Sequence, residues 1–86
     1  MPEISRFFGI VIRMRLHDHP PPHIHAHHGD HEAQIAIEFR GLMNGGLPPR
    51  TLALVFEWAR LHREELLENW HRLRDGRPPE RIAPLE

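Results

Sequence analysis

The sequence predicts an α+β fold in which an antiparallel meander of three to four strands packs on one long C-terminal helix. Three observations predict it. Apolar residues alternate with a period of two in the first half, a two-residue turn sets the register of a hairpin, and an apolar stripe with helical spacing follows. The 86 residues suit one small domain, 1–86, with strands at about 7–44, the helix at about 49–75 and an extended tail at 77–86.

The first strand is predicted from the alternation between residues 8 and 17. Apolar side chains at its even positions would form a buried face: Phe8, Ile10, Ile12, Met14 and Leu16. The odd positions would present Arg13, Arg15 and His17 outward. The prolines at 20–22 end the strand, because proline lacks the amide donor that a sheet needs.

The next two strands should form a hairpin around Gly29-Asp30, which suits a two-residue turn with glycine at its first central position. Pairing across this turn gives two apolar pairs on one face and two polar pairs on the other: Ile24–Ile35, Ala26–Ala33, His25–Gln34 and His27–Glu32. A slip of one residue would bury the imidazoles and expose the aliphatic side chains. We therefore expect His23, His25 and His27 on a polar, solvated face. A turn at 39–42 would lead into a short fourth strand.

The helix is predicted to begin near Pro49 and to end before Gly76. Its apolar stripe has spacings of three, four and seven: Leu52, Val55, Phe56, Ala59, Leu66, Trp70 and Leu73. The stripe is interrupted near Leu61–Arg63, where the helix is either continuous or broken. Trp58 falls on a flank of the stripe and would expose apolar surface. Three prolines within 77–86 predict a lightly anchored, extended tail.

Composition narrows the classes of function. The formal charge is −1, all eleven cations are arginine, and nine histidines make the charge sensitive to pH. The absence of cysteine excludes disulfides, thiolate metal sites and cysteine nucleophiles. Ser5 and Thr51 are the only hydroxyl side chains, which gives a serine triad little support. No apolar run approaches the ~18 residues of a membrane span, and the N-terminus is a poor signal peptide, so we expect a cytoplasmic protein without a membrane partner.

The histidine-rich segment is the strongest candidate site. His23 and His25 lie two apart on a strand, so their rings point the same way roughly 7 Å apart. They could hold one divalent metal, zinc or nickel, together with His19, whose approach the prolines restrict. Alternatively they could act as general base and acid, or be solvated histidines on a wet sheet face. His62, which shares a helix side with Glu65, is a third catalytic candidate.

A basic strip is the candidate partner or nucleic-acid face. It would consist of Arg13, Arg15, His17 and His27. The net charge of −1 and the glutamates on the same face disfavour strongly basic nucleic-acid binding, but not local phosphate contact. The small size, the long helix and Trp58 favour a homo-oligomer or a small cognate protein partner.

Several segments together carry a resemblance to a known family. They are Pro2–Met14, Asp18–Ala26 with Gly29, Leu47–Pro49, Glu57–Trp58, Leu61–Trp70 and Ile82–Leu85. The most specific is a core of histidines and prolines made up of His19, Pro21, Pro22, His23, His25 and Ala26. The chain resembles the small prokaryotic proteins grouped as domain of unknown function 4160. The family usually has phenylalanine at the position of Ile24 and an aromatic residue near His28, which weakens any role for His27 and His28.

The resemblance implies one half of a toxin–antitoxin-like gene pair. Its motif positions fall on His19, His23 and His25, and its helical part on His62, Asn69 and Trp70. We therefore expect a cytoplasmic module that binds a partner protein, with or without nucleic acid. Two alternatives stay open. One is a metal-dependent or histidine-based hydrolase such as a nuclease, and the other is a metal-binding protein without catalysis.

Overall fold

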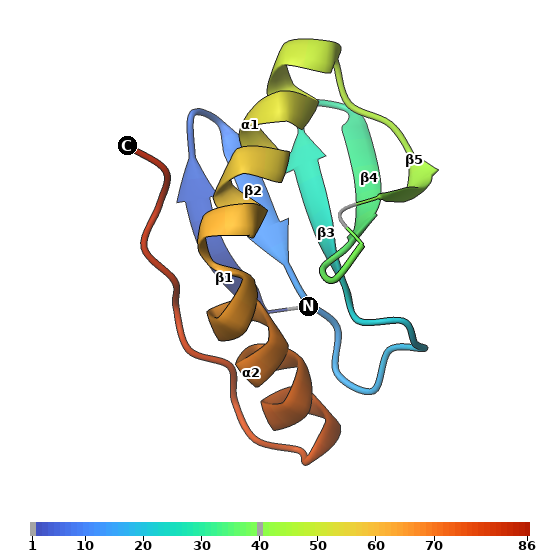
Figure 1. Ribbon diagram of the computed structural model, residues 1–86, viewed down its shortest axis with the longest axis vertical. Coiled ribbons are helices and arrows are strands. Elements are labelled where there is room, and N and C mark those ends of the chain that lie inside the picture. Colours follow the sequence, from blue (N-terminus) through green and yellow to red (C-terminus); the bar gives the residue numbers. More distant parts are fainter. Residues whose placement is uncertain (1, 40) are drawn as a thin grey trace.

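The computed structural model describes residues 2–39 and 41–86, and within them five strands precede two helices (Figure 1). The elements are β1 Glu3–Phe7, β2 Ile10–Arg13, β3 His23–His28, β4 His31–Ala36, β5 Leu42–Gly45, α1 Pro49–Leu61 and α2 Arg63–Arg74. Each strand pairs antiparallel with the next, so the sheet is a meander in the order β1-β2-β3-β4-β5. The predicted α+β class is confirmed, with one strand more than expected.

The additional strand arises from a turn inside the predicted first strand. Phe8 and Gly9 have positive φ angles of 49° and 77°, and they reverse the chain between β1 and β2. Ile10, Ile12 and Met14 are buried as the alternation predicts. Phe8 and Leu16 were expected to be buried with them, but they are 61% and 53% exposed because they lie in the turns at either end of β2.

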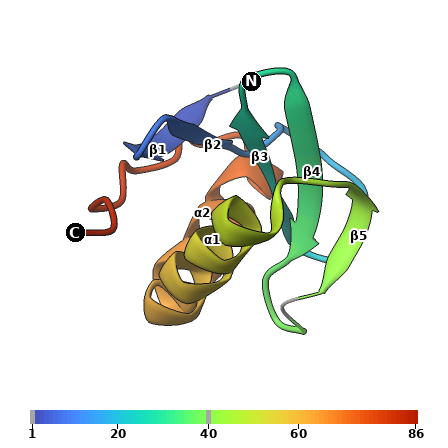
Figure 2. The same ribbon diagram turned by 90° about the horizontal axis from the view of Figure 1, so that it is seen from above.

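The β3–β4 hairpin has the predicted register. Ile24 pairs with Ile35 and Ala26 with Ala33, and Gly29 in the turn has a φ of 60°. All four apolar side chains are fully buried. The sheet curves around the helices, which lie along one of its faces (Figure 2). The alternation and the turn therefore sufficed to place the sheet's buried face.

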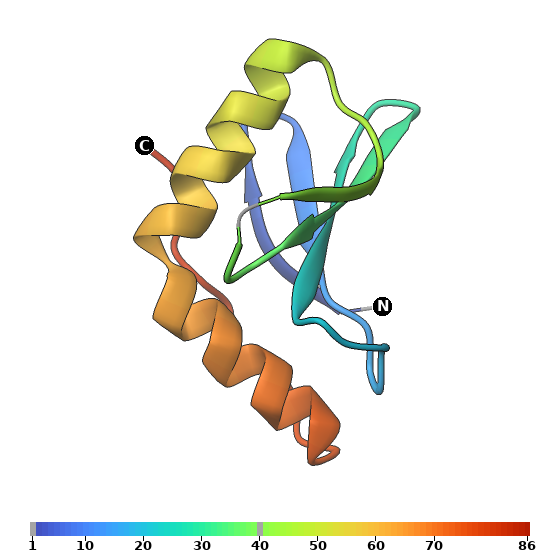
Figure 3. The same cartoon turned by 45° about the vertical axis from the view of Figure 1, so that its right-hand side comes forward.

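The C-terminal helix is broken, as one of the two alternatives predicted. α1 ends at Leu61 and α2 begins at Arg63, with His62 between them at φ −115° and ψ 25°. The two helices meet at an angle (Figure 3). Each contributes to one shared core: Val55, Trp58 and Ala59 from α1, and Leu66, Trp70 and Leu73 from α2. The break lets both segments keep an apolar stripe on the core.

Trp58 is a core residue rather than an exposed flank. Its side chain is fully buried, and its ring centroid lies 5.3 Å from that of Phe7 on β1. Its indole Nε1–H donates a 2.8 Å hydrogen bond to the carbonyl of Ala83. The expected exposed apolar surface is absent at Trp58, because the C-terminal tail covers this side of α1.

The tail is extended but firmly attached, which corrects the expectation of a lightly anchored end. Asn69 on α2 is buried, and its amide forms two 2.8 Å hydrogen bonds with the backbone of Glu80, one to the carbonyl and one from the N–H. Further along, the N–H of Ile82 donates to the carbonyl of Ile4 at 2.8 Å. Ser5 Oγ donates to the carbonyl of Ile82 at 2.9 Å. These bonds hold the tail against β1 and α2.

Among the described residues, none of the helices is both long enough and apolar enough to cross a bilayer.

Candidate metal centre

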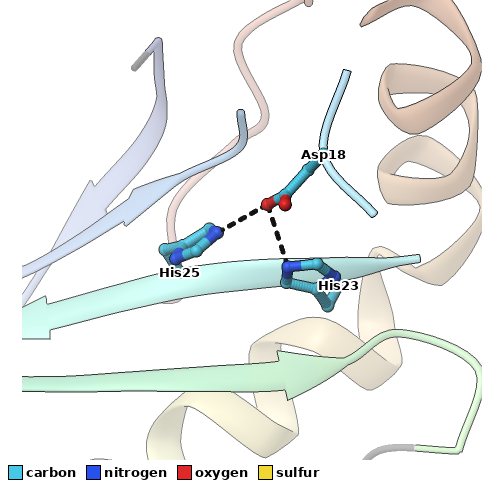
Figure 4. A group of neighbouring side chains, drawn as sticks. All are labelled: Asp18, His23 and His25. Atoms are coloured by element: carbon cyan, nitrogen blue, oxygen red, sulfur yellow. Dashed lines mark hydrogen bonds and ion pairs between the residues drawn. The ribbon is translucent and has the colours of Figure 1, made fainter. Parts of the chain in front are cut away.

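Three side chains from two segments converge at one point beside the sheet. They are Asp18 from the loop after β2, and His23 and His25 from β3 (Figure 4). One potential ligand atom from each lies within 4.8 Å of the others. Asp18 Oδ2 is 3.0 Å from His23 Nε2 and 2.9 Å from His25 Nε2. A single carboxylate oxygen thus faces two imidazole nitrogens.

The strand and the loop each contribute to this convergence. His23 and His25 are two residues apart on β3, so both rings lie on the same side of the strand, as the spacing predicts. The chain then brings Asp18 to them, because the loop between β2 and β3 passes over that side of the sheet. The proline run within this loop restricts its backbone, since each ring fixes φ.

The prediction that His23 and His25 are exposed to solvent is wrong. His23 and His25 were expected on a solvated face, yet they are 0% and 1% exposed. The Asp18 loop covers both rings, and the indole of Trp70 on α2 lies 5.4 Å from the ring of His23. These two imidazoles are therefore interior groups, and each needs polar partners for both of its nitrogens.

Each buried imidazole has an acceptor at its Nδ1. His23 Nδ1 lies 2.8 Å from the carbonyl oxygen of Pro21, and His25 Nδ1 lies 3.3 Å from a carboxylate oxygen of Glu32. Carbonyl and carboxylate oxygens only accept, so Nδ1 of His23 carries a hydrogen, and Nδ1 of His25 carries one when that ring donates to Glu32 rather than to Asp18. A neutral ring then has its lone pair on Nε2, the atom that faces Asp18. Histidine ligands of metals have this arrangement, with the distal N–H donated to a carbonyl or carboxylate.

The Asp18 carboxylate is buried and ionised. Its side chain is 6% exposed. Burial raises the pKa of Asp18, but the hydrogen bond from His25, the backbone N–H of His19 and the charges of His23 and His25 outweigh it, so this pKa lies below its ordinary value. A buried carboxylate needs compensating positive charge. In the described part of the chain, the buried Nε2 of His23 lies close to Asp18 but forms no hydrogen bond.

Asp18 is the member of the cluster that the sequence did not predict. In the sequence it stands only within the segment Asp18–Ala26 that carries the family resemblance, and no role is predicted for it. A signal was present, because Asp18 directly precedes His19 and the proline run that leads to His23. A carboxylate beside two histidines at strand spacing would complete a metal-ligand set, since zinc accepts both nitrogen and oxygen ligands.

The third predicted ligand, His19, lies next to the cluster. Its ring stacks on that of His23, with centroids 5.2 Å apart and planes inclined by 29°. His19 Nε2 is 3.8 Å from Asp18 Oδ1, and its side chain is 68% exposed. The structure therefore brings His19 close to the cluster but leaves its ring open to solvent.

The predicted basic strip follows β2, the next loop and β3. Arg13 pairs with His25 across β2 and β3, while Arg15 and His17 are exposed beyond the end of β2. His27 is half-buried, and its Nδ1 lies 3.7 Å from Glu32. The four residues are thus arranged along the segments that also hold the cluster.

His62 is separate from this cluster. It lies at the junction of the two helices, and its Nδ1 is 2.6 Å from a carboxylate oxygen of Glu65. Its ring centroid is 5.4 Å from that of Trp58. Asn69, which the family resemblance groups with His62, binds the backbone of the tail. His62 therefore does not join Asp18, His23 and His25 in the cluster.

The meander, the two-part helix and the buried Asp/His cluster define a small α+β protein with a compact polar centre under one loop. The chain belongs to the family described as "Domain of unknown function (DUF4160)", whose model matches residues 9–71, more than half of the chain. The match includes Asp18, His19, His23 and His25. Neither the curated proteins nor the solved structures contain a significant match.

Proposed function

We propose that this protein binds one divalent transition-metal ion, of which zinc is the type, through Asp18, His23 and His25. The observation that carries the proposal is the orientation of both imidazoles. Each has an acceptor at Nδ1, and both Nε2 atoms face the same buried carboxylate oxygen. In a tetrahedral zinc site, bonds of about 2.0–2.1 Å separate the ligand atoms by about 3.3 Å. The separations of 2.9 and 3.0 Å are a few tenths shorter, so small side-chain movements accommodate the ion.

The charge balance also favours a metal ion over protons alone. A neutral His25 can donate to Asp18 or to Glu32, but not to both. Without a metal, both contacts require a charged imidazolium in the interior, and His23 requires the same between Pro21 and Asp18. One divalent ion satisfies both Nε2 atoms and the carboxylate, while each Nδ1–H keeps its acceptor.

Zinc titration of the untagged protein tests this proposal. We expect one zinc ion to bind per protein chain when the protein competes with a chromophoric chelator for zinc. His25→Ala and Asp18→Asn should each weaken binding by about 100-fold or more, since each removes a ligand and outer partners alone are worth about 10–100-fold. His71→Ala is the matched control, because His71 is exposed on α2, and it should bind as the wild type does. Circular dichroism shows whether each variant is folded.

The change of binding affinity with pH distinguishes a metal site from an anion-binding site. A metal needs imidazole lone pairs, so acidification should weaken zinc binding. A phosphate or acidic partner on the basic strip would instead bind more tightly in acid and less tightly at high salt. Absence of stoichiometric zinc binding, or variants that bind as tightly as the wild type, would contradict the metal proposal.

A second candidate function is partner binding, as a cytoplasmic module of a toxin–antitoxin-like pair. Exposed apolar side chains support it: Phe8, Leu16, Phe39, Leu42 and Leu61. Phe39 is the most exposed of them, at 83%. Burial of such side chains in an interface removes apolar surface from water, which is energetically favourable.

We expect the native protein to form a homo-oligomer or a complex with the product of an adjacent small gene. Light scattering of the untagged protein, alone and co-expressed with that product, measures the mass. Phe39→Ser should reduce the association, whereas Ala53→Ser, at an exposed position of α1, should not. A stable monomer at all micromolar concentrations, with no complex on co-expression, would contradict this second candidate.

A further inference from the structure

His19 lies beside the cluster, and its side chain is 68% exposed to solvent. Its ring covers that of His23, and its Nε2 is 3.8 Å from the Asp18 oxygen that does not face the two buried rings. We propose that His19 is the fourth ligand of the metal ion. With His19 bound, the ion has no free position for water, so the centre is a non-catalytic metal site. This inference rests on the proposed metal binding by Asp18, His23 and His25.

The tautomer of His19 matches that of the two buried rings. Its Nδ1 lies 3.3 Å from the carbonyl oxygen of Pro20, which can only accept a hydrogen bond. The hydrogen is therefore on Nδ1 and the lone pair is on Nε2. All three histidines thus direct Nδ1 to an acceptor and Nε2 to the carboxylate of Asp18.

His19 can reach a bound ion by movement of its side chain alone. Its side chain is 68% exposed, so rotation disturbs only its stacking on His23 and its contact with the Pro20 carbonyl. Its backbone is already held in place, because its N–H donates a 2.9 Å hydrogen bond to Asp18 Oδ1. The prolines that follow limit the backbone further. Closure therefore costs side-chain entropy of one residue and little else.

The identity of the fourth ligand decides between the two metal alternatives. Three protein ligands leave a position for water, which is the arrangement of hydrolytic zinc sites. Four protein ligands exclude that water and are typical of structural sites. Three imidazoles and one carboxylate favour a tetrahedral borderline ion such as zinc or cobalt over magnesium or calcium, which prefer oxygen ligands.

Cobalt(II) in place of zinc makes the fourth position visible, because four-coordinate cobalt absorbs strongly in the visible range and its spectrum responds to ligand exchange. The cobalt-loaded wild type should not respond to added azide. His19→Ala should open a position for water, shift the spectrum on azide addition and weaken cobalt binding by at least about 10-fold. His71→Ala, which changes an exposed histidine on α2, should behave as the wild type.

The outcomes separate this inference from the proposed function. A wild type that binds cobalt and responds to azide as His19→Ala does would overturn closure by His19 and favour the hydrolase. Equal cobalt affinity and spectra in the wild type and His19→Ala would overturn it as well. Failure of every form to bind cobalt would refute the metal site itself and this inference with it.

Discussion

Replacement of Trp58 by alanine is expected to lower the free energy of unfolding by about 3–5 kcal/mol. Trp58 is fully buried, and its ring packs on that of Phe7 across the interface between α1 and β1. The substitution leaves a cavity there and removes the hydrogen bond to the carbonyl of Ala83, which also loosens the tail. Equilibrium unfolding in urea, followed by circular dichroism, measures the change.

Two further variants make this result interpretable. Trp58→Phe keeps most of the ring but lacks the N–H, so it should cost less than the alanine variant and remain folded if the alanine variant does not. Leu61→Ala removes an exposed side chain from the same helix and should change stability by less than about 1 kcal/mol. A Trp58→Ala variant as stable as Leu61→Ala would contradict the burial of Trp58 in the core.

Ile35→Ala is expected to cost about 2–5 kcal/mol, through loss of burial and through the cavity left behind. Ile35 is fully buried and lies directly opposite Ile24 in the β3–β4 hairpin. The adjacent Gln34 lies on the other face of the strand and is only half-buried, so Gln34→Ala should cost far less. Chemical denaturation of both variants gives the comparison, and the reverse ranking would contradict the hairpin register.

The β3–β4 hairpin could be predicted because two independent signals agreed on one register. The turn at Gly29 set the pairing, and the apolar alternation selected the buried face. β1 could not be predicted in the same way. Its five residues include Ser5 and Arg6 between the buried Ile4 and Phe7, so the period of two is lost. Phe8 then continued the alternation of β2 by coincidence, although it belongs to the turn.

The candidate site was predictable only in its local part. Spacing along β3 is sufficient to place His23 and His25 on one side of the strand. Their burial depends on the path of the Asp18 loop and on the position of Trp70 in α2, both of which are tertiary features. The same holds for the tail, because nothing near Asn69 in the sequence indicates that its amide binds the backbone of Glu80.

The attachment of the tail has a consequence for solubility. Unpaired strands at the borders of a sheet are templates on which other chains can add and aggregate. Here the segment around Ile82 lies along the outer border of β1 and takes up hydrogen-bonding groups of Ile4 and Ser5. The opposite border is β5, which has only four residues and an irregular register with β4. One border is thus capped by the protein's own chain end, and the other is too short to recruit a neighbour efficiently.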